Sequence, residues 1–423
     1  MAVCDRRRPL LLGSAGPHHE ANGLDTPGGP ASRSLSSAPT NGPRTRDFGP
    51  YRRRRSTAQI QVSLTTAPRD QESGTMAMKA PTRSGTTIVT LTMNPALDIT
   101  TDTDRVIPTD KMRCGLPRYD PGGGGINVAR IAHALGASVS AIFPAGGHTG
   151  DKVTALVAES GVAVQRITVA RSTRESFTVD EDRTGQQYRF VLPGPRLTDA
   201  EQTECLNKLS AAAASADFVV ASGSLPPGVP TDFYQRVAQV CGEAGARLIL
   251  DTSGAGLRHI TSGAFLLKAS VRELRECVER GLVNESEQLA AAHELVDRGC
   301  AQVVVVSLGS KGALVATPTA SQHYLPVTVP SGSGVGAGDA MVAGITVGLS
   351  RGWQLDKAVR LGIAAGAAMI LTPGTAPCTR EDVERFFEMA ADPIDIDAPR
   401  RNDAKPRPAT ADQWLSAQAR TSP

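Results

Sequence analysis

The chain has 423 residues with 45 Lys and Arg against 42 Asp and Glu, so it is longer than one typical domain and can bury a large core. Its seven cysteines never stand in a Cys-x-x-Cys spacing and its histidines form no cluster, which disfavours both a disulfide framework and a zinc site built by the protein. The longest apolar runs, near residues 211–221 and 363–371, are too short to span a bilayer, so we expect a cytoplasmic protein with free thiols and no membrane partner.

The first 85 residues differ from the rest, because they carry 13 Lys and Arg against 6 Asp and Glu. They are rich in Pro, Gly, Ser and Thr and show almost no apolar periodicity, so they cannot bury enough surface to fold. We expect a disordered basic extension over 1–85, or upstream sequence included by choosing too early a start, with Met76 or Met78 as the natural beginning. Binding of nucleic acid by this segment is a less favoured alternative, and we assign no nucleic-acid partner.

The next stretch predicts a strand and a helix joined through a glycine-rich segment. Ile88–Met93 is apolar and predicts a buried strand, and Asp98 follows near its carboxyl end, where open α/β sheets bind their ligands. Four glycines, Gly122–Gly125, precede a helical pattern over residues 126–135, so a ligand must approach the backbone closely there. The amide of Asn127 offers a donor and an acceptor to the vicinal hydroxyls of a polyol.

Strand-like runs then alternate with helical patterns as far as residue 371. We expect strands at 139–144, 218–221, 247–251, 265–268 and 302–308, and helices at 151–160, 200–214, 232–243, 286–298, 340–349 and 354–371. This order implies an α/β fold with a doubly wound, mainly parallel sheet and helices on both faces, within a domain over 86–390 that a disordered tail over 391–423 follows. Residues 97–119 and 176–192 alternate polar and apolar side chains instead, and they predict a small lid of exposed strands with a hairpin at Asp182–Gly185.

A glycine turn near the end of the domain predicts an anion site. Gly336 and Gly338 let backbone N–H groups face a ligand, and the helix that follows adds its N-terminal dipole, so a phosphoryl group in transfer suits this turn. Asp339 stands at the start of the same helix. A carboxylate repels phosphate unless it has a task, and we expect Asp339 to take the proton from an attacking hydroxyl. For this motif alone, an ordinary glycine-rich helix cap is the alternative.

Together the two glycine motifs resemble the signatures of the PfkB (ribokinase-like) carbohydrate kinases, and the resemblance covers residues 88–387. Within the family the match is closest to the minor bacterial 6-phosphofructokinases. It rests on these segments in family order: Leu91–Asp98, Lys111–Cys114, the four glycines, Phe143–Gly147, Gln187–Phe190, Ser222–Gly228 and Val305–Gly309.

The resemblance implies ATP-dependent phosphorylation of D-fructose 6-phosphate at its 1-hydroxyl, with ATP and Mg²⁺ as cofactors. It also implies a lid that covers the sugar and pairs with a second subunit in a homodimer. Two alternative kinase activities remain possible, those of 1-phosphofructokinase and of tagatose-6-phosphate kinase. A third alternative is a catalytically weak sensor of a sugar phosphate or nucleotide.

Roles for individual residues follow from the motifs together with the resemblance. The base is Asp339, and the anion hole is formed by the N–H groups of Gly336, Ala337 and Gly338. The sugar is assigned to Asp98, Gly123, Gly124, Asn127 and Ser222, and its 6-phosphate to Lys111, Arg113 and Arg174. The nucleotide is assigned to Lys268, Ser270, Ser307, Gly309 and Gly312, and Mg²⁺ to Glu273.

The nucleotide end departs from the family pattern at two positions. Ser270 stands where relatives usually have Asn in a Lys-Pro-Asn-x-x-Glu motif. Gly334 replaces a usual threonine ahead of the glycine turn Gly336–Gly338, which we name the anion turn. A hydroxyl is shorter than an amide and offers fewer hydrogen-bonding groups. We therefore expect that catalysis is retained with an altered affinity for the nucleotide.

Overall fold

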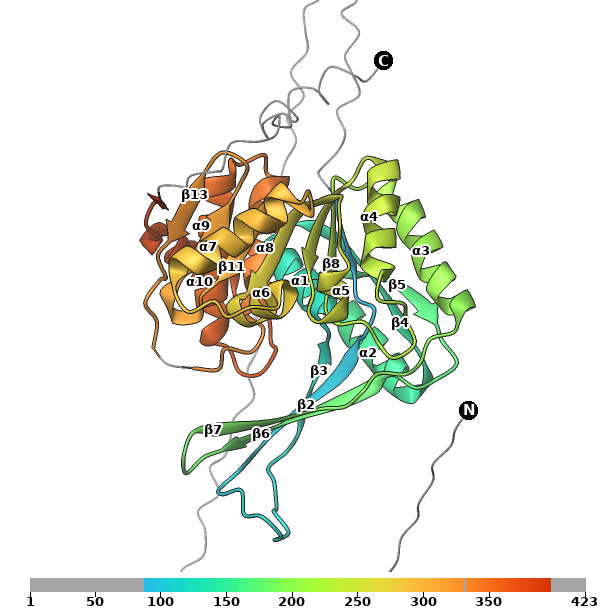
Figure 1. Ribbon diagram of the computed structural model, residues 1–423. Coiled ribbons are helices and arrows are strands. Elements are labelled where there is room, and N and C mark those ends of the chain that lie inside the picture. Colours follow the sequence, from blue (N-terminus) through green and yellow to red (C-terminus); the bar gives the residue numbers. More distant parts are fainter. Residues whose placement is uncertain (1–86, 331, 397–423) are drawn as a thin grey trace, which may run out of the picture. The chain divides into compact units, whose positions relative to one another are not determined.

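The structure is a computed structural model that describes residues 87–330 and 332–396 (Figure 1). The expected extension over 1–85 and the tail after residue 396 lie outside the described residues. At the centre lies a ten-stranded sheet. Its strands in chain order are β1 (Thr87–Leu91), β4 (Ser138–Ala145), β5 (Ala163–Thr168), β8 (Phe218–Ser222), β9 (Arg247–Asp251), β10 (Ala264–Ser270), β11 (Ala301–Ser307), β12 (Ala313–Ala316), β13 (Ser321–Tyr324) and β14 (Ile394–Asp395).

The spatial order of this sheet is β14-β13-β12-β11-β10-β9-β8-β1-β4-β5. Neighbouring strands from β5 through to β11 pair in parallel, whereas β12, β13 and β14 add an antiparallel edge. The predicted doubly wound, mainly parallel sheet is therefore confirmed. The first residues of the expected tail, Ile394–Asp395, pair with β13 and extend this edge.

Helices cover both faces of the sheet. They are α1 (Gly124–Ala134), α2 (Gly147–Glu159), α3 (Asp199–Ala213), α4 (Phe233–Ala244), α5 (Ala255–Arg258), α6 (Val271–Val278), α7 (Glu285–Asp297), α8 (Ala337–Ser350), α9 (Leu355–Ile370) and α10 (Arg380–Met389), with a 3₁₀ turn at Gly309–Lys311. Within the described ranges no helix has both the length and the apolar character needed to cross a membrane.

Alternate side chains of each buried strand enter two separate cores, as the period of two requires. On β8, Phe218 and Val220 belong to the core on the side of α1 and α8, whereas Val219 and Ala221 belong to the core on the side of α4. Because β5 through to β11 run parallel, their carboxyl ends lie together at one edge of the sheet. The first turns of α1 and α8 reach this edge, since Gly124 and Asp339 line one cavity with Ser222 at the end of β8.

A second sheet of four strands projects from the core, as Figure 1 shows. Its strands are β2 (Ala96–Thr103), β3 (Arg118–Gly122), β6 (Arg174–Glu181) and β7 (Gln186–Val191), in the spatial order β3-β2-β6-β7. The β6–β7 pair is the expected hairpin, and a loop over residues 104–117 separates β2 from β3. Apolar side chains remain on its surface, with Phe190 55% and Val191 64% exposed. We name these four strands and the 104–117 loop the lid.

Candidate active site

Asp339 lies in the first turn of α8, directly after the glycine turn. Gly336 is the N-cap of α8 and has a φ of 76°, a left-handed conformation that favours glycine. The amide Nδ2 of Asn127, from α1, donates to Oδ2 of Asp339 at 2.9 Å. The hydroxyl of Ser222, at the end of β8, donates to Oδ1 at 3.4 Å. Two elements that are distant in sequence therefore fix the orientation of one carboxylate.

The surroundings of Asp339 adjust its basicity. Burial raises the pKa of Asp339 to about 7, and the neighbouring carboxylate of Asp251 acts in the same direction. The hydrogen bonds from Asn127 and Ser222 and the charge of Lys268 oppose this rise. A carboxylate whose pKa lies near neutrality is suited to general-base catalysis at physiological pH.

A buried ion pair stands beside the anion turn. Nζ of Lys268, on β10, lies 3.1 Å from Oδ2 and 3.3 Å from Oδ1 of Asp251, at the end of β9. Burial acts to lower the pKa of Lys268, but the charges of Asp251, Glu273 and Asp339 raise it overall, so the ammonium stays protonated. A Cβ at Gly338 would lie only 2.8 Å from this ammonium, so Lys268 reaches the anion turn.

The first of three adjoining cavities has a volume of about 190 Å³ and lies between the lid and the core. Five of the residues assigned to the sugar or its phosphate line it: Asp98, Gly123, Gly124, Asn127 and Arg174. Asp339 lines it too, and Gly374 and Thr375 contribute from the segment after α9. We name it the sugar cavity. Burial raises the pKa of Asp98 to about 6, and the charges of Arg174 and Arg189 oppose this rise.

The second cavity, of about 260 Å³, continues from the first and is here named the middle cavity. It shares Gly124, Gly336 and Asp339 with the sugar cavity. Ser222, Asp251, Lys268 and Glu273 also line it. Its floor is close-packed, because a Cβ at Gly124 would lie 2.1 Å from the Ser222 hydroxyl.

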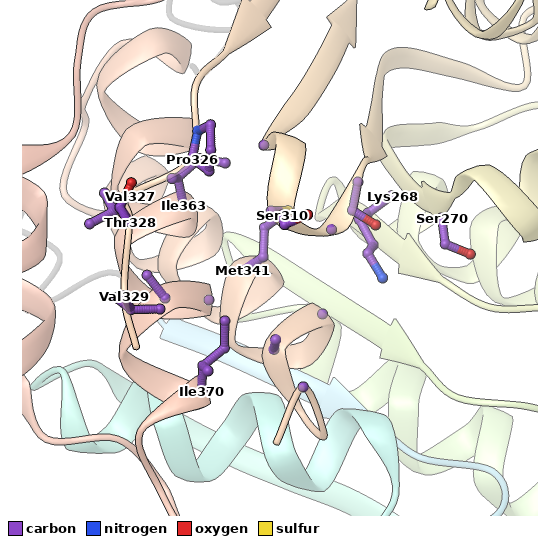
Figure 2. Close-up of a pocket in the computed structure, with 18 of the residues that line it drawn as sticks. Lys268, Ser270, Ser310, Pro326, Val327, Thr328, Val329, Met341, Ile363 and Ile370 are labelled. Carbon is purple, nitrogen blue, oxygen red and sulfur yellow. The ribbon is translucent and has the colours of Figure 1, made fainter. Parts of the chain in front are cut away.

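The third cavity, of about 630 Å³, opens beside the anion turn and is here named the nucleotide cavity. It brings together every residue that the sequence analysis assigns to the nucleotide: Lys268, Ser270, Ser307, Gly309 and Gly312. Figure 2 shows Lys268 and Ser270 at one end and the apolar Val327, Val329, Ile363 and Ile370 at the other. The charged end suits the phosphate chain of a nucleotide, and the apolar end suits its nucleobase.

Ser270 and Glu273 form a reciprocal capping box at the start of α6. The backbone N–H and the hydroxyl of Ser270 donate to Oε2 of Glu273 at 2.8 and 2.7 Å, and the Glu273 N–H lies 3.3 Å from the Ser270 oxygen. The residue that replaces the usual Asn therefore stabilises the helix start. Within the ranges that the structure describes, no group of three or more His, Cys, Asp or Glu side chains is arranged to hold a metal ion.

Two predicted residues lie away from the cavities. Lys111 and Arg113 are exposed on the 104–117 loop, and neither lines the sugar cavity of its own chain. Conversely, Arg189 and Asp251 were not predicted from the sequence as site residues. Arg189 lines the sugar cavity from β7 and belongs to the Gln187–Phe190 motif. Asp251 directly follows an apolar run at the end of β9, so both positions carried a usable signal.

The chain is similar in sequence and fold to proteins of a known family. The model of the pfkB family carbohydrate kinases matches residues 91–382. The chain is 69% identical over 309 residues to ATP-dependent 6-phosphofructokinase isozyme 2 of Mycobacterium tuberculosis, an alignment that covers 73% of this chain and 91% of that protein. It is 39% identical over 302 residues to the protein of the same name from Escherichia coli, covering 71% and 97%.

Among solved structures, the fold is similar to phosphofructokinase-2 from Escherichia coli in complex with fructose-6-phosphate. The TM-score is 0.68 at 38% identity, and the match covers 72% of this chain and 99% of that one. The resemblance and the fold inferred from the sequence are thereby confirmed. The chain belongs to the pfkB family of carbohydrate kinases.

Proposed function

We propose that this chain transfers the γ-phosphoryl group of ATP to the 1-hydroxyl of D-fructose 6-phosphate, giving fructose 1,6-bisphosphate and ADP. One observation carries the proposal: Asp339 lies where the sugar cavity meets the middle cavity, which continues to the nucleotide cavity through Lys268 and Gly338. The activity named for the two similar 6-phosphofructokinases and the ligand of the similar solved structure support the same substrate.

The proposed chemistry needs one proton transfer and one displacement. Asp98 and Asn127 bind hydroxyls of the sugar, and Arg174 with Arg189 provides positive charge for its phosphate. Asp339 accepts the proton of the 1-hydroxyl as its oxygen attacks the γ-phosphorus. The bond from this phosphorus to the bridging oxygen breaks, and ADP leaves. The N–H groups of Gly336, Ala337 and Gly338, together with Lys268, stabilise the charge on the transferring group.

We also place a magnesium ion at the middle cavity, which Glu273 lines. Mg²⁺ prefers oxygen ligands, usually one or two carboxylates, with waters and substrate phosphates completing its coordination. We assign Glu273 to this ion. When bound, Mg²⁺ would neutralise charge on the nucleotide phosphates.

Two copies of the chain would pair through their lids. The lid keeps exposed apolar side chains, among them Phe177, Phe190 and Val191, and a partner would cover them. In such a pair the 104–117 loop of each copy would extend toward the sugar cavity of the other. That arrangement would bring Lys111 and Arg113 to the sugar phosphate, which they do not approach within their own chain.

An assay of ADP release over a panel of sugars tests the function. Fructose 6-phosphate should be turned over much faster than free fructose, ribose or adenosine, because the cations at the sugar cavity have no partner in an unphosphorylated sugar. Equal or faster turnover of ribose or adenosine would contradict the assignment. Preference for fructose 1-phosphate or tagatose 6-phosphate would favour the alternative kinases, and release of no ADP with any sugar would favour a sensor.

Light scattering tests the pairing. We expect a homodimer, and we expect Phe190→Asp to dissociate it and to raise KM for the sugar phosphate. Val283→Asp is the matched control, since Val283 is an apolar residue that is 88% exposed but lies outside the lid. A wild-type monomer that is fully active at assay concentrations would refute the dimer.

The pH profile should show the ionisation of Asp339. The base must be deprotonated to accept a proton, so log kcat/KM should rise with pH and level off above about 7, the pKa to which burial raises Asp339. Protonation of Asp98 should steepen the decline below about pH 6. Rates measured between pH 5 and 9 give the profile, and a flat profile from pH 5.5 to 8 would contradict the assigned base.

A further inference from the structure

Arg130 is an almost completely buried cation beside the sugar cavity. It lies one turn after Asn127 in α1 and is 7% exposed. Its Nη1 donates to the carbonyl oxygen of Thr375 at 2.9 Å and to that of Pro121 at 3.3 Å. Its Nη2 lies 3.8 Å from Oδ1 of Asp120. One guanidinium therefore connects α1, β3 and the segment between α9 and α10.

Neutralising Asp120 is not a sufficient reason to bury this charge. Nε of Arg118 lies 2.7 Å from Oδ2 of Asp120, which is a closer partner than Arg130. Taking a guanidinium out of water is costly, and its planar fork suits several fixed acceptors at once. The two carbonyl groups are therefore the contacts that require Arg130.

One carbonyl group belongs to a residue that lines the sugar cavity, and the other belongs to a residue just before such a lining segment. Pro121 directly precedes the four glycines, two of which line the cavity on one side. Thr375 and its neighbour Gly374 line it on another side. Residues 371–379 form neither helix nor strand, so their position depends on contacts such as the one from Arg130.

We propose that Arg130 is a positioning residue for the sugar phosphate, which holds the Thr375 segment against the glycine-rich loop and so sets the shape of the sugar cavity. The proposal rests on the function proposed above, because it concerns the affinity of the same cavity. Arg130 does not itself line any of the three cavities, so it acts through the walls that it joins.

The charge of Arg130 has a second effect, on Asp98. The charged groups that face Asp98 are Arg174 from β6, Arg189 from β7, Asp120 from β3 and Arg130 from α1. The three arginines lower the pKa of Asp98, whereas Asp120 and above all burial raise it. Removing the charge of Arg130 should consequently move the protonation of Asp98 to higher pH, while Arg130→Lys should not.

The test compares Arg130→Met and Arg130→Lys with wild type. A hydrogen bond from a charged group contributes roughly 10- to 100-fold to an equilibrium, so KM for fructose 6-phosphate should rise by about that factor in both variants. KM for ATP should change less than about threefold, because the nucleotide cavity lacks this contact. In Arg130→Met alone, the steeper decline of kcat/KM that accompanies protonation of Asp98 should begin at higher pH.

Arg351→Lys is the matched control. Nη2 of Arg351 also donates to a carbonyl oxygen of the α1 segment, that of Leu135 at 2.7 Å, but at the end remote from Asn127. This variant should keep both KM values. A KM for fructose 6-phosphate within about twofold of wild type in both Arg130 variants, or an equal rise in the control, would overturn the proposal. KM does not depend on the folded fraction of the sample, so a modest loss of stability does not obscure it.

Amide hydrogen exchange measured without substrate tests the role of Arg130 independently of the proposed kinase activity. Amides of residues 372–378 should exchange faster in the Arg130 variants than in wild type or Arg351→Lys, and unchanged exchange would overturn the proposal. If wild type fails to phosphorylate fructose 6-phosphate, the proposed function fails while exchange still reports on Arg130. Failure of both variants to fold would show that Arg130 serves the fold itself, which would also overturn the proposal.

Discussion

Replacing Asp339 by Asn is expected to lower kcat by roughly 10²- to 10⁴-fold, because Asn keeps the size of the side chain but cannot accept a proton. This loss corresponds to about 3 to 5.5 kcal/mol of transition-state stabilisation. KM for the sugar phosphate should hardly change, since the amide can still interact with Asn127 and Ser222. Steady-state kinetics on the purified variant measure both constants.

The same substitution should leave the fold intact or stabilise it. Burial raises the pKa of Asp339 from an ordinary value of 3.8 to about 7, so between these values the folded chain holds a proton that the unfolded chain has released. Stability is therefore lost as pH rises through this window, and a neutral amide avoids that loss. We expect the Tm of Asp339→Asn to exceed that of wild type at pH 8, with a smaller difference at pH 5.

Asp356→Asn is the matched control for this experiment. Asp356 also lies in the first turn of a helix, α9, but it lines none of the three cavities. Its variant should keep normal kcat. A folded Asp339→Asn enzyme with more than about a tenth of normal kcat would exclude Asp339 as the base.

Replacing Lys268 by Met should affect stability and turnover together. Lys268 and Asp251 are each less than a tenth exposed, and removing one member of a buried ion pair leaves the other charge uncompensated. Such a loss costs about 3 to 5 kcal/mol of folding free energy. Turnover should fall as well, because Lys268 reaches the anion turn at Gly338. Chemical denaturation and kinetics on the same sample measure the two effects.

The double variant Lys268→Met with Asp251→Asn separates these effects. It removes both charges, so most of the lost folding free energy should return. Turnover should stay low, because the ammonium that reaches the turn at Gly338 is still missing. Recovery of turnover together with stability would show that Lys268 serves only to neutralise Asp251.

Six of the ten strands of the central sheet could be predicted, because they are short apolar runs, such as residues 301–307, that enter cores on both faces. The strand β5 and the antiparallel edge strands β12, β13 and β14 were not predicted. The first residue of a helix was harder to predict where glycines stand at the helix start. The helices α2 and α8 begin at Gly147 and Ala337, earlier than predicted, because glycine-rich turns do not resemble helix starts. Helix α6 was not predicted from the sequence, because it has only eight residues and its apolar side chains Val271, Leu274 and Val278 make too short a pattern.

The site could be predicted where the groups expected to bind one ligand are consecutive in the sequence, as in the glycine turn before Asp339. It could not be predicted where the contact depends on which strands are neighbours. The pair of Lys268 and Asp251 exists because β10 lies beside β9, and chain order alone does not fix that adjacency. Similarly, a pattern shows that Lys111 and Arg113 are cations but does not show which cations face the cavity.

The position of β1 has a consequence for the order in which the protein can fold. This strand is the first of the described chain, yet it lies inside the sheet between β4 and β8, and its Thr87 N–H bonds Asp217, 130 residues later. During synthesis, one edge of β1 must therefore wait unpaired until β8 emerges, which exposes it to aggregation. Asn127 donates to Asp339 across 212 residues, so we expect the carboxylate of Asp339 to be oriented late in folding. Recovery of activity after denaturation should consequently lag behind the recovery of secondary structure.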